Sequence, residues 1–599
     1  MSQSANPTIG RFEVERRLGR GTQGQVYLCW DPKLERNVAV KIIHASSDYD
    51  ETDRAEVIDE ARLAARLSHP NVVPIFEAGI HKNSPVLIFE YVEGVPLRQY
   101  IKDHGVFSES EALTLMMGIG AGMQCAHDQG VAHLDLSPNN IMVDVENRPR
   151  VMDFGLARLV SKTVLNDGEM ISGTPRYMSP EHFSSRPLGA ATDVFSLGLI
   201  FYELMAAKHA LDAPTVDAMV GVICKVEVEW SALTRAKISP EVIALIRDML
   251  HPDPVSRIAD GGEFVTVMQD ILAIKKSEEK GELTLEFLLR RLKRRPEFPA
   301  FSQSIIEVNR LTDEDSVAGY DKDGAVILRD FSLTNRVMKI ANSAFFDRGS
   351  EGVKTISQAI SRLGLNLVRM ISNGLMMFDQ AEGRDPKLSD ALVKSFITAL
   401  LARHLASQTS KRLAEEAFIS GLFHQLGSHL IMFYLEHESE DIQALIDSGI
   451  DIEQAERRIL STTSASLGQA IATTWHFPDS IIDCMTKIPN GDIAAPANNQ
   501  DIVFLTVNFA NELCELVDLA KPGADVVADT ERLVARYRSI YQHDAMDLVK
   551  LLIAALDKFS QISPALGINV SKSVICNKIR GFNIEFSNRL IPIPDRLPA

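Results

Sequence analysis

The sequence predicts a protein of several domains, in which an α+β domain is followed by a region built almost entirely of helices. Near the N-terminus, apolar residues alternate with period two in the runs RFEVERRLG, QVYLCW and NVAVKII. This spacing is typical of strands in a twisted antiparallel sheet. From about residue 108 to 274, apolar residues recur mostly at helical spacing. A charged stretch, KKSEEKGE, then separates this domain from a second helical region.

The composition excludes several classes of protein. Hydrophobic residues make up 45% and charged residues 24% of the 599 residues, which excludes a disordered or collagen-like chain. The formal net charge of −18 argues against a general nucleic-acid-binding protein. The six cysteines include no CxxC pair, so neither a disulfide framework nor a thiolate zinc site is indicated. Without a signal-peptide pattern or an apolar stretch of ~20 residues, we expect a cytoplasmic protein with no membrane span.

A glycine-rich turn lies between the first two predicted strands. Residues 19–24 read GRGTQG and fit the pattern G-x-G-x-x-G, with Val26 two residues later. Glycines let the backbone close over phosphate groups, although a simple hairpin turn would use the same residues. Because the turn joins two strands, a dinucleotide-binding motif is disfavoured. Lys41 in the next strand and Glu60 on the following helix form a pair that, beside such a turn, suits the binding of nucleotide phosphates.

Two loops further along the chain carry polar residues suited to phosphoryl transfer. The first reads HLDLSPNN at residues 133–140, and the second begins at Asp153 and reads DFG. A carboxylate at Asp135 can accept a hydrogen bond from an attacking hydroxyl group and orient it. Asn140 and Asp153 can supply oxygen ligands for a magnesium ion that bridges phosphates. The two loops therefore predict chemistry on a nucleotide.

The whole series of motifs, closed by GTPRYMSPE at residues 173–181 and by Asp193, resembles a bacterial eukaryotic-like (Hanks-type) serine/threonine protein kinase. The resemblance covers residues 9–274. It implies the bilobal α+β protein-kinase fold, ATP and Mg²⁺ as cofactors, and a protein substrate that accepts phosphate on serine or threonine. It also implies that Glu181 and Arg257 form a buried structural ion pair and that Asp193 braces the catalytic loop.

The same resemblance assigns roles to individual residues. Asp135 is implied as the catalytic base and Lys41 as the residue that holds the α- and β-phosphates. Asn140 and Asp153 are implied as metal ligands. The residues implied to surround the nucleotide are Leu18, Gly19, Gly21, Gly24, Val26, Ala39, Lys41, Glu60, Glu90 and Val92. These roles together predict in-line transfer of a phosphoryl group.

Two positions depart from the family pattern. Leu134 stands where many members carry an arginine that grips a phosphorylated loop residue, and Ser137 stands where a lysine usually lies near the transferred phosphate. Loss of that lysine removes a positive charge from a reaction that depends on electrostatic positioning. Two alternatives stay open: an active kinase, and a nucleotide-binding pseudokinase scaffold that acts only through protein binding. Because Leu134 cannot pair with a phosphate, we expect activity to depend weakly on phosphorylation of the loop that follows DFG.

The helical region carries a second resemblance. The runs PEFPA at 296–300, KIANS at 339–343 and ISQAISRLG at 356–364 are similar, in order, to an HDOD domain, an all-helical bacterial relative of metal-dependent HD phosphohydrolases. The His-Asp pair of those enzymes reads His424-Gln425 here, and a neutral amide cannot supply the anionic charge that a divalent metal needs. The resemblance implies a non-catalytic module that binds a signalling partner. An HD-type nucleotide phosphohydrolase is a further alternative.

These observations set the expected domain boundaries. We expect a protein kinase domain at residues 9–274, a charged linker at 275–289, an HDOD domain at 290–515 and a helical C-terminal extension at 516–599. A basic run at residues 290–295 opens the HDOD domain. A solvated helix face or a contact with an acidic partner is favoured there, and nucleic-acid binding is disfavoured by the overall acidity.

Overall fold

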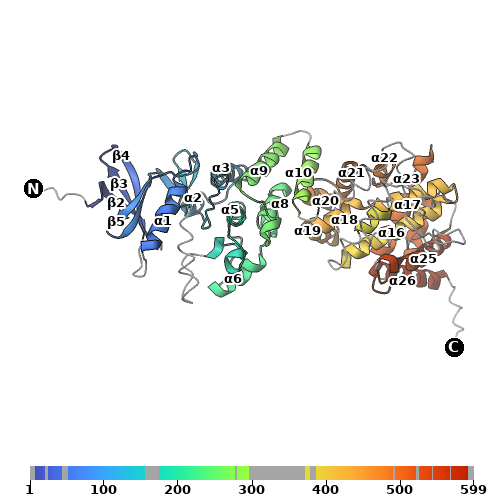
Figure 1. Ribbon diagram of the computed structural model, residues 1–599. Coiled ribbons are helices and arrows are strands. Elements are labelled where there is room, and N and C mark those ends of the chain that lie inside the picture. The colour runs from blue at the N-terminus through green and yellow to red at the C-terminus, as the bar shows by residue number, and fades with distance from the viewer. Residues whose placement is uncertain are drawn as a thin grey trace, which may run out of the picture. The chain divides into compact units, whose positions relative to one another are not determined.

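The structure is a computed structural model that divides into two compact units, Met1–Leu283 and Thr284–Ala599, and Figure 1 shows the order of their elements. It describes residues 7–20, 24–43, 51–154, 175–276, 280–295, 298, 368, 371–377, 386–489, 491, 493–520, 525–541, 544–566 and 568–590. Gly21 of the glycine-rich turn and the runs at 339–343 and 356–364 lie outside the described residues.

The first unit begins with a six-stranded antiparallel sheet in the order β1-β2-β3-β4-β6-β5. Its strands are β1 (Thr8–Ile9), β2 (Phe12–Arg20), β3 (Gly24–Asp31), β4 (Arg36–Ile43), β5 (Ile75–His81) and β6 (Ser84–Glu90). The period-two pattern is confirmed, because Val38 and Val40 of β4 are both buried in one core with Cys29. Helix α1 (Glu51–Ala64) packs against β5 and β6 and buries Val57.

The rest of the first unit is mostly helical and contains helix α5 (Ala190–Ala206), in which every residue from Thr192 to Met205 is buried. The other elements are α2 (Leu97–His104), α3 (Glu109–His127), α6 (Val216–Lys225), α7 (Ser231–Arg235), α8 (Pro240–Met249), α9 (Gly261–Lys276), η1 (Pro175–Tyr177), η2 (Pro180–Phe183), η3 (Pro254–Ser256), β7 (Gly94–Pro96), β8 (Ile141–Asp144) and β9 (Pro149–Val151). The last three form a small sheet in the order β7-β8-β9. The loop between α3 and β8 and the segment after β9 carry Asp135 and Asp153.

Helix α3 positions the loop that carries Asp135. Its first turn is fixed by a capping box, in which Ser108 Oγ accepts a hydrogen bond from the Glu111 N–H and the Glu111 carboxylate accepts one from the Ser108 N–H at 2.8 Å. Its last residue, His127, lies 2.9 Å from Asp193 of α5. The loop that carries Asp135 therefore follows a helix whose last residue is held in place by Asp193.

The described residues of the second unit form helices. They are α10 (Lys280–Arg294), which begins just before the boundary, α16 (Pro386–Ala406), α17 (Lys411–Phe423), α18 (Leu426–Tyr434), α19 (Glu436–Asp447), α20 (Ile452–Leu460), α21 (Ser464–Thr474), α22 (Asp479–Asp483), α23 (Asn499–Leu519), α24 (Val526–Arg536), α25 (Ala545–Ile562), η4 (Ser563–Leu566) and α26 (Val574–Leu590). Helices α16, α17 and α23 pack against one another. The C-terminal extension is part of the same unit, since Phe559 of α25 lies 5.8 Å from Phe396 of α16.

Helix α10 occupies part of the stretch expected as a linker. Its side chains Phe287 and Leu288 are buried. Arg291, in the basic run, is also buried and forms an ion pair with Glu438 of α19 at 3.0 Å. One member of the run therefore faces the interior, because an acidic partner within the same unit neutralises it. The linker boundary at residue 289 remains a prediction.

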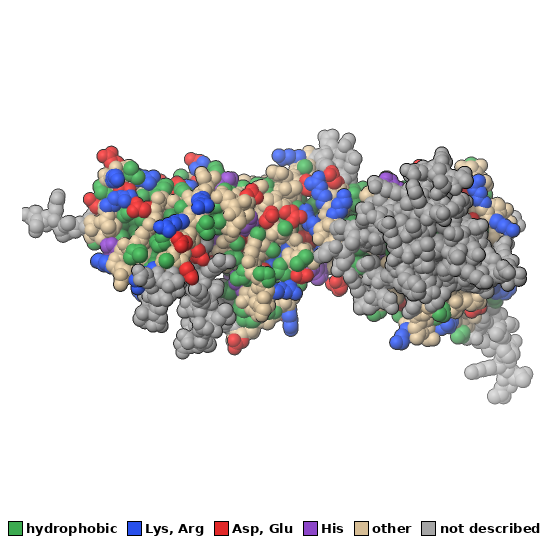
Figure 2. All heavy atoms as spheres, viewed as in Figure 1, with side chains coloured by type: hydrophobic (Ala, Val, Ile, Leu, Met, Phe, Trp, Pro, Cys, Tyr) green, Lys and Arg blue, Asp and Glu red, His purple; other side chains and the backbone are tan. Residues whose placement is uncertain are grey.

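The fold class expected from the sequence, α+β followed by all-α, is confirmed. Over the described ranges, no helix combines the length and apolar character needed to cross a membrane. On the face drawn in Figure 2, Lys and Arg side chains are mixed with Asp and Glu side chains over the described parts.

Candidate active site

The candidate site centres on an ion pair between β4 and the segment after β9. Lys41 lies in β4 with its side chain only 7% exposed, and its Nζ donates to Asp153 Oδ2 at 2.8 Å. Asp153 has φ +66°, a left-handed conformation that aspartate adopts more readily than most residues. The fold thus joins two of the predicted site residues that lie 112 positions apart.

Buried polar groups hold the loop that carries Asp135. Asp193 of α5 is fully buried and accepts hydrogen bonds from the backbone N–H groups of His133 and Leu134, both at 2.7 Å. The predicted bracing role of Asp193 is confirmed. Asn140 Nδ2 donates to the backbone carbonyl of Asp135 at 2.7 Å and, more weakly, to its carboxylate at 3.4 Å. Asn140 therefore lies directly beside the predicted base.

A further contact ties this loop to η2. The ring of His182 lies with Nε2 3.3 Å from the Leu134 carbonyl oxygen, and its Nδ1 accepts from the Ser179 N–H at 3.1 Å. Because a backbone N–H can only donate, Nε2 of the neutral ring carries the proton donated to Leu134. Leu134 has φ +62°, which is unfavourable for a bulky side chain. His182 carries no signal in the sequence, since an isolated histidine is usually structural.

Negative charge gathers at this site. Asp135 is exposed as a residue, although nearby protein removes part of the hydration of its carboxylate. This partial burial and the charge of Asp153 raise the pKa of Asp135, while His133 and Lys41 oppose the rise. Two carboxylates and the Asn140 amide form a set of oxygen donors of the kind Mg²⁺ prefers. The residues present therefore fit a magnesium ion bound together with phosphate groups, to which Lys41 can bind.

Seven of the ten residues predicted to surround the nucleotide lie on strands of one sheet: Leu18, Gly19, Gly24, Val26, Ala39, Lys41 and Glu90. Leu18 of β2 is 37% exposed. Val26 of β3 lies opposite Lys41 in the strand register, and Ala39 of β4 lies opposite Phe89 of β6. The antiparallel register thus gathers on one sheet residues taken from four strands.

The two described glycines of the turn differ in the space around them. A Cβ at Gly24 would lie 2.2 Å from the Ile42 carbonyl oxygen, so the strand pairing itself requires glycine there. A Cβ at Gly19 would meet no atom within 4 Å. Gly24 is therefore explained by the sheet, whereas Gly19 borders open space.

The strand β6 ends at Glu90, whose carboxylate pairs with both terminal nitrogens of Arg150 in β9, at 2.6 and 2.8 Å. A two-pronged contact of this kind fixes direction as well as distance. Val92, two residues further, is buried. The segment with Glu90 and Val92, both implied to surround the nucleotide, is therefore held in place at its start.

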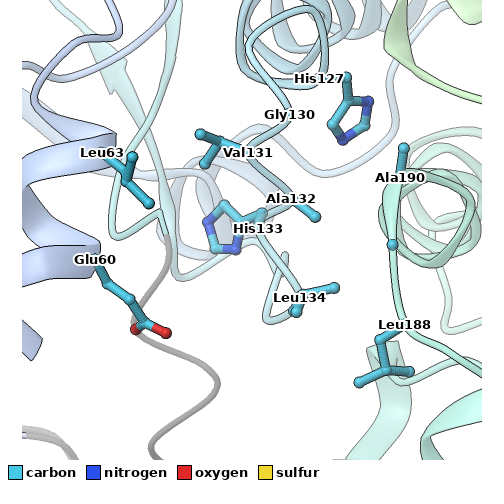
Figure 3. A pocket seen from close by; sticks show the side chains of 11 residues that line it. Glu60, Leu63, His127, Gly130, Val131, Ala132, His133, Leu134, Leu188 and Ala190 are labelled. Carbon is cyan, nitrogen blue, oxygen red and sulfur yellow. The ribbon is translucent and has the colours of Figure 1, made fainter. Parts of the chain in front are cut away.

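A cavity of about 310 Å³ lies beside the catalytic loop. Figure 3 shows Glu60 and Leu63 of α1 on one side, Leu134 near the centre and Leu188 on the opposite side. Among the described lining residues, Glu60 is the one with a carboxylate. Leu134 therefore borders a largely apolar space. The predicted pairing of Glu60 with Lys41 remains a prediction.

The predicted ion pair of Glu181 and Arg257 is confirmed. Both terminal nitrogens of the guanidinium group donate to the carboxylate, at 2.6 and 2.8 Å, and neither side chain is exposed. Burial alone would raise the pKa of Glu181, but the hydrogen bonds and charge of Arg257 outweigh it and lower the pKa. The pair anchors η2 and, with it, His182.

The helical unit has a polar centre of its own at the His424-Gln425 pair. Gln425 Nε2 donates to Asn511 Oδ1 at 2.9 Å and to Glu515 Oε1 at 3.1 Å. Lys487 Nζ donates to Glu515 at 3.1 Å, and His424 is buried with Nδ1 bonded to a backbone carbonyl. An ammonium group therefore neutralises the carboxylate at this point.

Comparison with known proteins agrees with both resemblances. Residues 12–272 match the protein kinase domain family and residues 298–490 match the HDOD domain family. "Probable serine/threonine-protein kinase PknB" of Lactococcus lactis is 29% identical over 282 residues, which cover 46% of this chain and 44% of the relative. "Serine/threonine-protein kinase PrkC" of Bacillus subtilis is 32% identical over 203 residues, covering 34% of this chain and 31% of the relative.

A third relative, "Probable serine/threonine-protein kinase CA_C1728" of Clostridium acetobutylicum, is 32% identical over 265 residues, covering 44% of this chain and 40% of the relative. The chain thus spans less than half the length of each of these relatives.

Proposed function

We propose that this chain, which contains a protein kinase domain followed by an HDOD domain, is an ATP-dependent serine/threonine protein kinase of bacterial signalling. In this proposal the HDOD domain binds a partner and has no catalytic activity. The observation that carries it is the 2.8 Å contact of Lys41 with Asp153, beside Asp135 and Asn140. An ammonium group, two carboxylates and an amide are the set that phosphoryl transfer from ATP uses.

In the proposed reaction, Asp135 orients the hydroxyl group of a serine or threonine and accepts its proton. A bond forms between the hydroxyl oxygen and the γ-phosphorus, and the bond to the β–γ bridging oxygen breaks, which releases ADP. Lys41 binds α- and β-phosphate oxygens. A magnesium ion held by Asp153 and Asn140 neutralises phosphate charge when it is bound. The raised pKa of Asp135 makes it a better proton acceptor than a carboxylate of ordinary pKa.

The test is phosphate transfer from labelled ATP, compared between the chain and Asp135→Asn. We expect the substitution to abolish autophosphorylation, by at least about a thousandfold, and to leave ATP binding nearly unchanged, since Asp135 faces the acceptor hydroxyl. Asp128→Asn, which changes an exposed aspartate of the same unit, is the control and should have wild-type activity.

Two outcomes would contradict the proposal in different ways. Full phosphotransfer by Asp135→Asn would refute the assignment of the base. A wild-type chain that binds ATP without transferring phosphate would instead support the pseudokinase scaffold, with the missing positive charge at Ser137 as its physical reason.

We also propose a cytoplasmic location. All six cysteines are free, and burial raises the pKa of the Cys29, Cys484 and Cys514 thiols to about 11, which keeps them protonated and unreactive. Free thiols of this kind suit a reducing compartment. Fractionation of cells that produce the chain tests this location.

A further inference from the structure

The second unit contains a cavity of about 810 Å³ between α23, α24, the start of α20 and residues 487–489. The α23 residues that line it include Asn508, Asn511, Glu512 and Glu515, and this spacing is one face of a helix. The lining residues of α24 recur with the same period. The cavity therefore has the walls of a groove between two helices, a shape into which a third helix can be laid. It also joins the HDOD domain to the C-terminal extension, for which the sequence indicates no role.

Negatively charged side chains outnumber positively charged ones in this groove. Five carboxylates and three cations line it, which gives a net charge of −2. Each cation already has a carboxylate partner: Lys487 contacts Glu515 at 3.1 Å, Arg536 contacts Glu512 at 2.7 Å, and Arg532 contacts Asp529.

The two remaining carboxylates lie together at the start of α20. Asp451 caps that helix by accepting hydrogen bonds from two backbone N–H groups. Glu453 is 54% exposed, and its carboxylate forms a long ion pair of 4.0 Å with Arg457, an exposed residue of the same helix that does not line the groove. The groove favours a positively charged occupant and disfavours an anionic one, because the side chains that line it carry a net charge of −2.

Apolar side chains border the same groove. Leu519, at the end of α23, is 70% exposed, and Ile452, at the start of α20, is 38% exposed. Leu516 and Leu533 also line the groove. Exposed apolar surface beside a net negative charge is typical of a surface that another protein covers.

We propose that this groove is the docking site for a basic amphipathic helical segment of a partner protein. Its apolar face would lie on Leu519 and Ile452, and its lysine or arginine side chains would face Glu453. The inference rests on the proposed role of the HDOD domain as a binding module, and it names the site and the chemistry of the partner.

The experiment measures binding of a fluorescent helical peptide of about 15 residues to the full chain by anisotropy. The peptide carries leucine at positions i, i+3, i+4 and i+7 and lysine along the flanks. The same peptide with every lysine replaced by glutamate is the charge-reversed control. We expect the basic peptide to bind, its affinity to fall as salt is added, and the charge-reversed peptide to bind at least tenfold more weakly.

Two substitutions test the charged and the apolar contributions to binding separately. Glu453→Lys should weaken binding about tenfold by reversing a charge that faces the peptide, and Leu519→Ser should weaken it about tenfold by removing apolar contact. The matched controls are Glu415→Lys and Ile584→Ser, which change exposed residues outside the groove. Both controls should bind like the wild type.

The proposal is overturned if the basic peptide does not bind, if the charge-reversed peptide binds equally well, or if the groove variants and the control variants lose the same affinity. Failure to bind is also the outcome expected if another part of this chain fills the groove. Phosphotransfer is measured on the same samples. A chain that phosphorylates but does not bind the peptide refutes the docking site alone, and one that binds but does not phosphorylate refutes the kinase assignment alone.

Discussion

The two units each gather polar side chains at one point, but they balance charge differently. In the kinase domain, the carboxylates of Asp135 and Asp153 lie near one ammonium group, that of Lys41. In the helical unit, Glu515 accepts from Lys487 and from the amide of Gln425. In the first site two carboxylates share one cation, whereas in the second site Lys487 neutralises Glu515.

The titration behaviour follows this difference. Burial and Asp153 raise the pKa of Asp135. Burial would also raise the pKa of Glu515, but the charges of Lys487 and Lys394 outweigh it and the pKa is lowered. The site with Asp135 and Asp153 has fewer cations than carboxylates, so it favours a ligand that brings positive charge. The site with Glu515 already contains a neutralising cation, Lys487. The two sites therefore differ in net charge, although the residue types are similar.

The largest difference is expected when one carboxylate in each site is replaced by the corresponding amide. Asp153→Asn should reduce phosphotransfer at least about a thousandfold, because it removes the proposed metal ligand and the partner of Lys41. Glu515→Gln should leave the initial rate within about twofold, since that carboxylate neutralises Lys487 and takes part in no transfer. Initial rates with labelled ATP decide between them. Comparable losses in both variants would show that the second centre also serves the reaction.

A buried ion pair in each unit gives a second comparison. Arg257→Met leaves Glu181 buried without its partner, and Arg291→Met does the same to Glu438. Each should lower the free energy of unfolding of its own unit by about 3–5 kcal/mol. Denaturant titration followed by hydrogen exchange measures the loss in each unit. A change below about 1 kcal/mol in either would show that the pair is replaceable by packing.

The helical unit should also respond to acid through His429. Burial, and the nearby charge of Lys394, lower the pKa of His429 to about 4, below the usual value near 6.5. The unfolded chain therefore binds an extra proton between these values, so stability is complete above about pH 6.5 and is lost as the pH falls toward 4. The loss reaches about 3 kcal/mol.

The measurement is thermal unfolding across that pH range for the wild type and His429→Gln, with the exposed His437→Gln as control. Only His429→Gln should flatten the profile. Parallel profiles for all three proteins would show that other groups cause the acid sensitivity, either carboxylates or the buried His424, whose pKa is also lowered by burial.

A smaller effect is expected from the loop that follows DFG, which lies outside the described residues. Single alanine substitutions at Ser161, Thr163, Ser172 and Thr174 should change the initial rate by no more than about threefold, because Leu134 offers no cation for a phosphate. Thr174 matches a position that kinases often use structurally, so its loss alone is not decisive. A collapse in Ser161→Ala or Thr163→Ala that an acidic residue restores would show that another cation replaces the arginine.

The smallest effect should be that of separating the units. Residues 1–280 alone should fold and bind ATP with an affinity within about twofold of the full chain, because the kinase core lies within its own compact unit. Calorimetric titration with ATP measures this. An insoluble fragment from a chain that is soluble when whole would show that the two units share a core.

Local patterns predict part of this molecule well. The strands around the glycine turn follow from period-two alternation, and the pairing of Glu181 with Arg257 is what the resemblance to protein kinases implies. Contacts between isolated residues that lie far apart in the chain cannot be predicted from such patterns. Nothing in the sequence around His182 indicates its bond to Leu134, 48 positions away. Arg291 sits in a run that looks solvated, and its partner lies 147 positions further along the chain.

The backbone of Leu134 is held at both its N–H and its carbonyl by residues from other elements, Asp193 and His182. Its side chain takes part in neither bond. Replacement of Leu134 by arginine should therefore keep both backbone hydrogen bonds, and with them the course of the loop that carries Asp135. In evolutionary terms, the gain or loss of a phosphate-gripping arginine is a single step that needs no compensating mutation in the loop. A lineage can thus acquire or discard control by phosphorylation while it inherits the catalytic machinery unchanged.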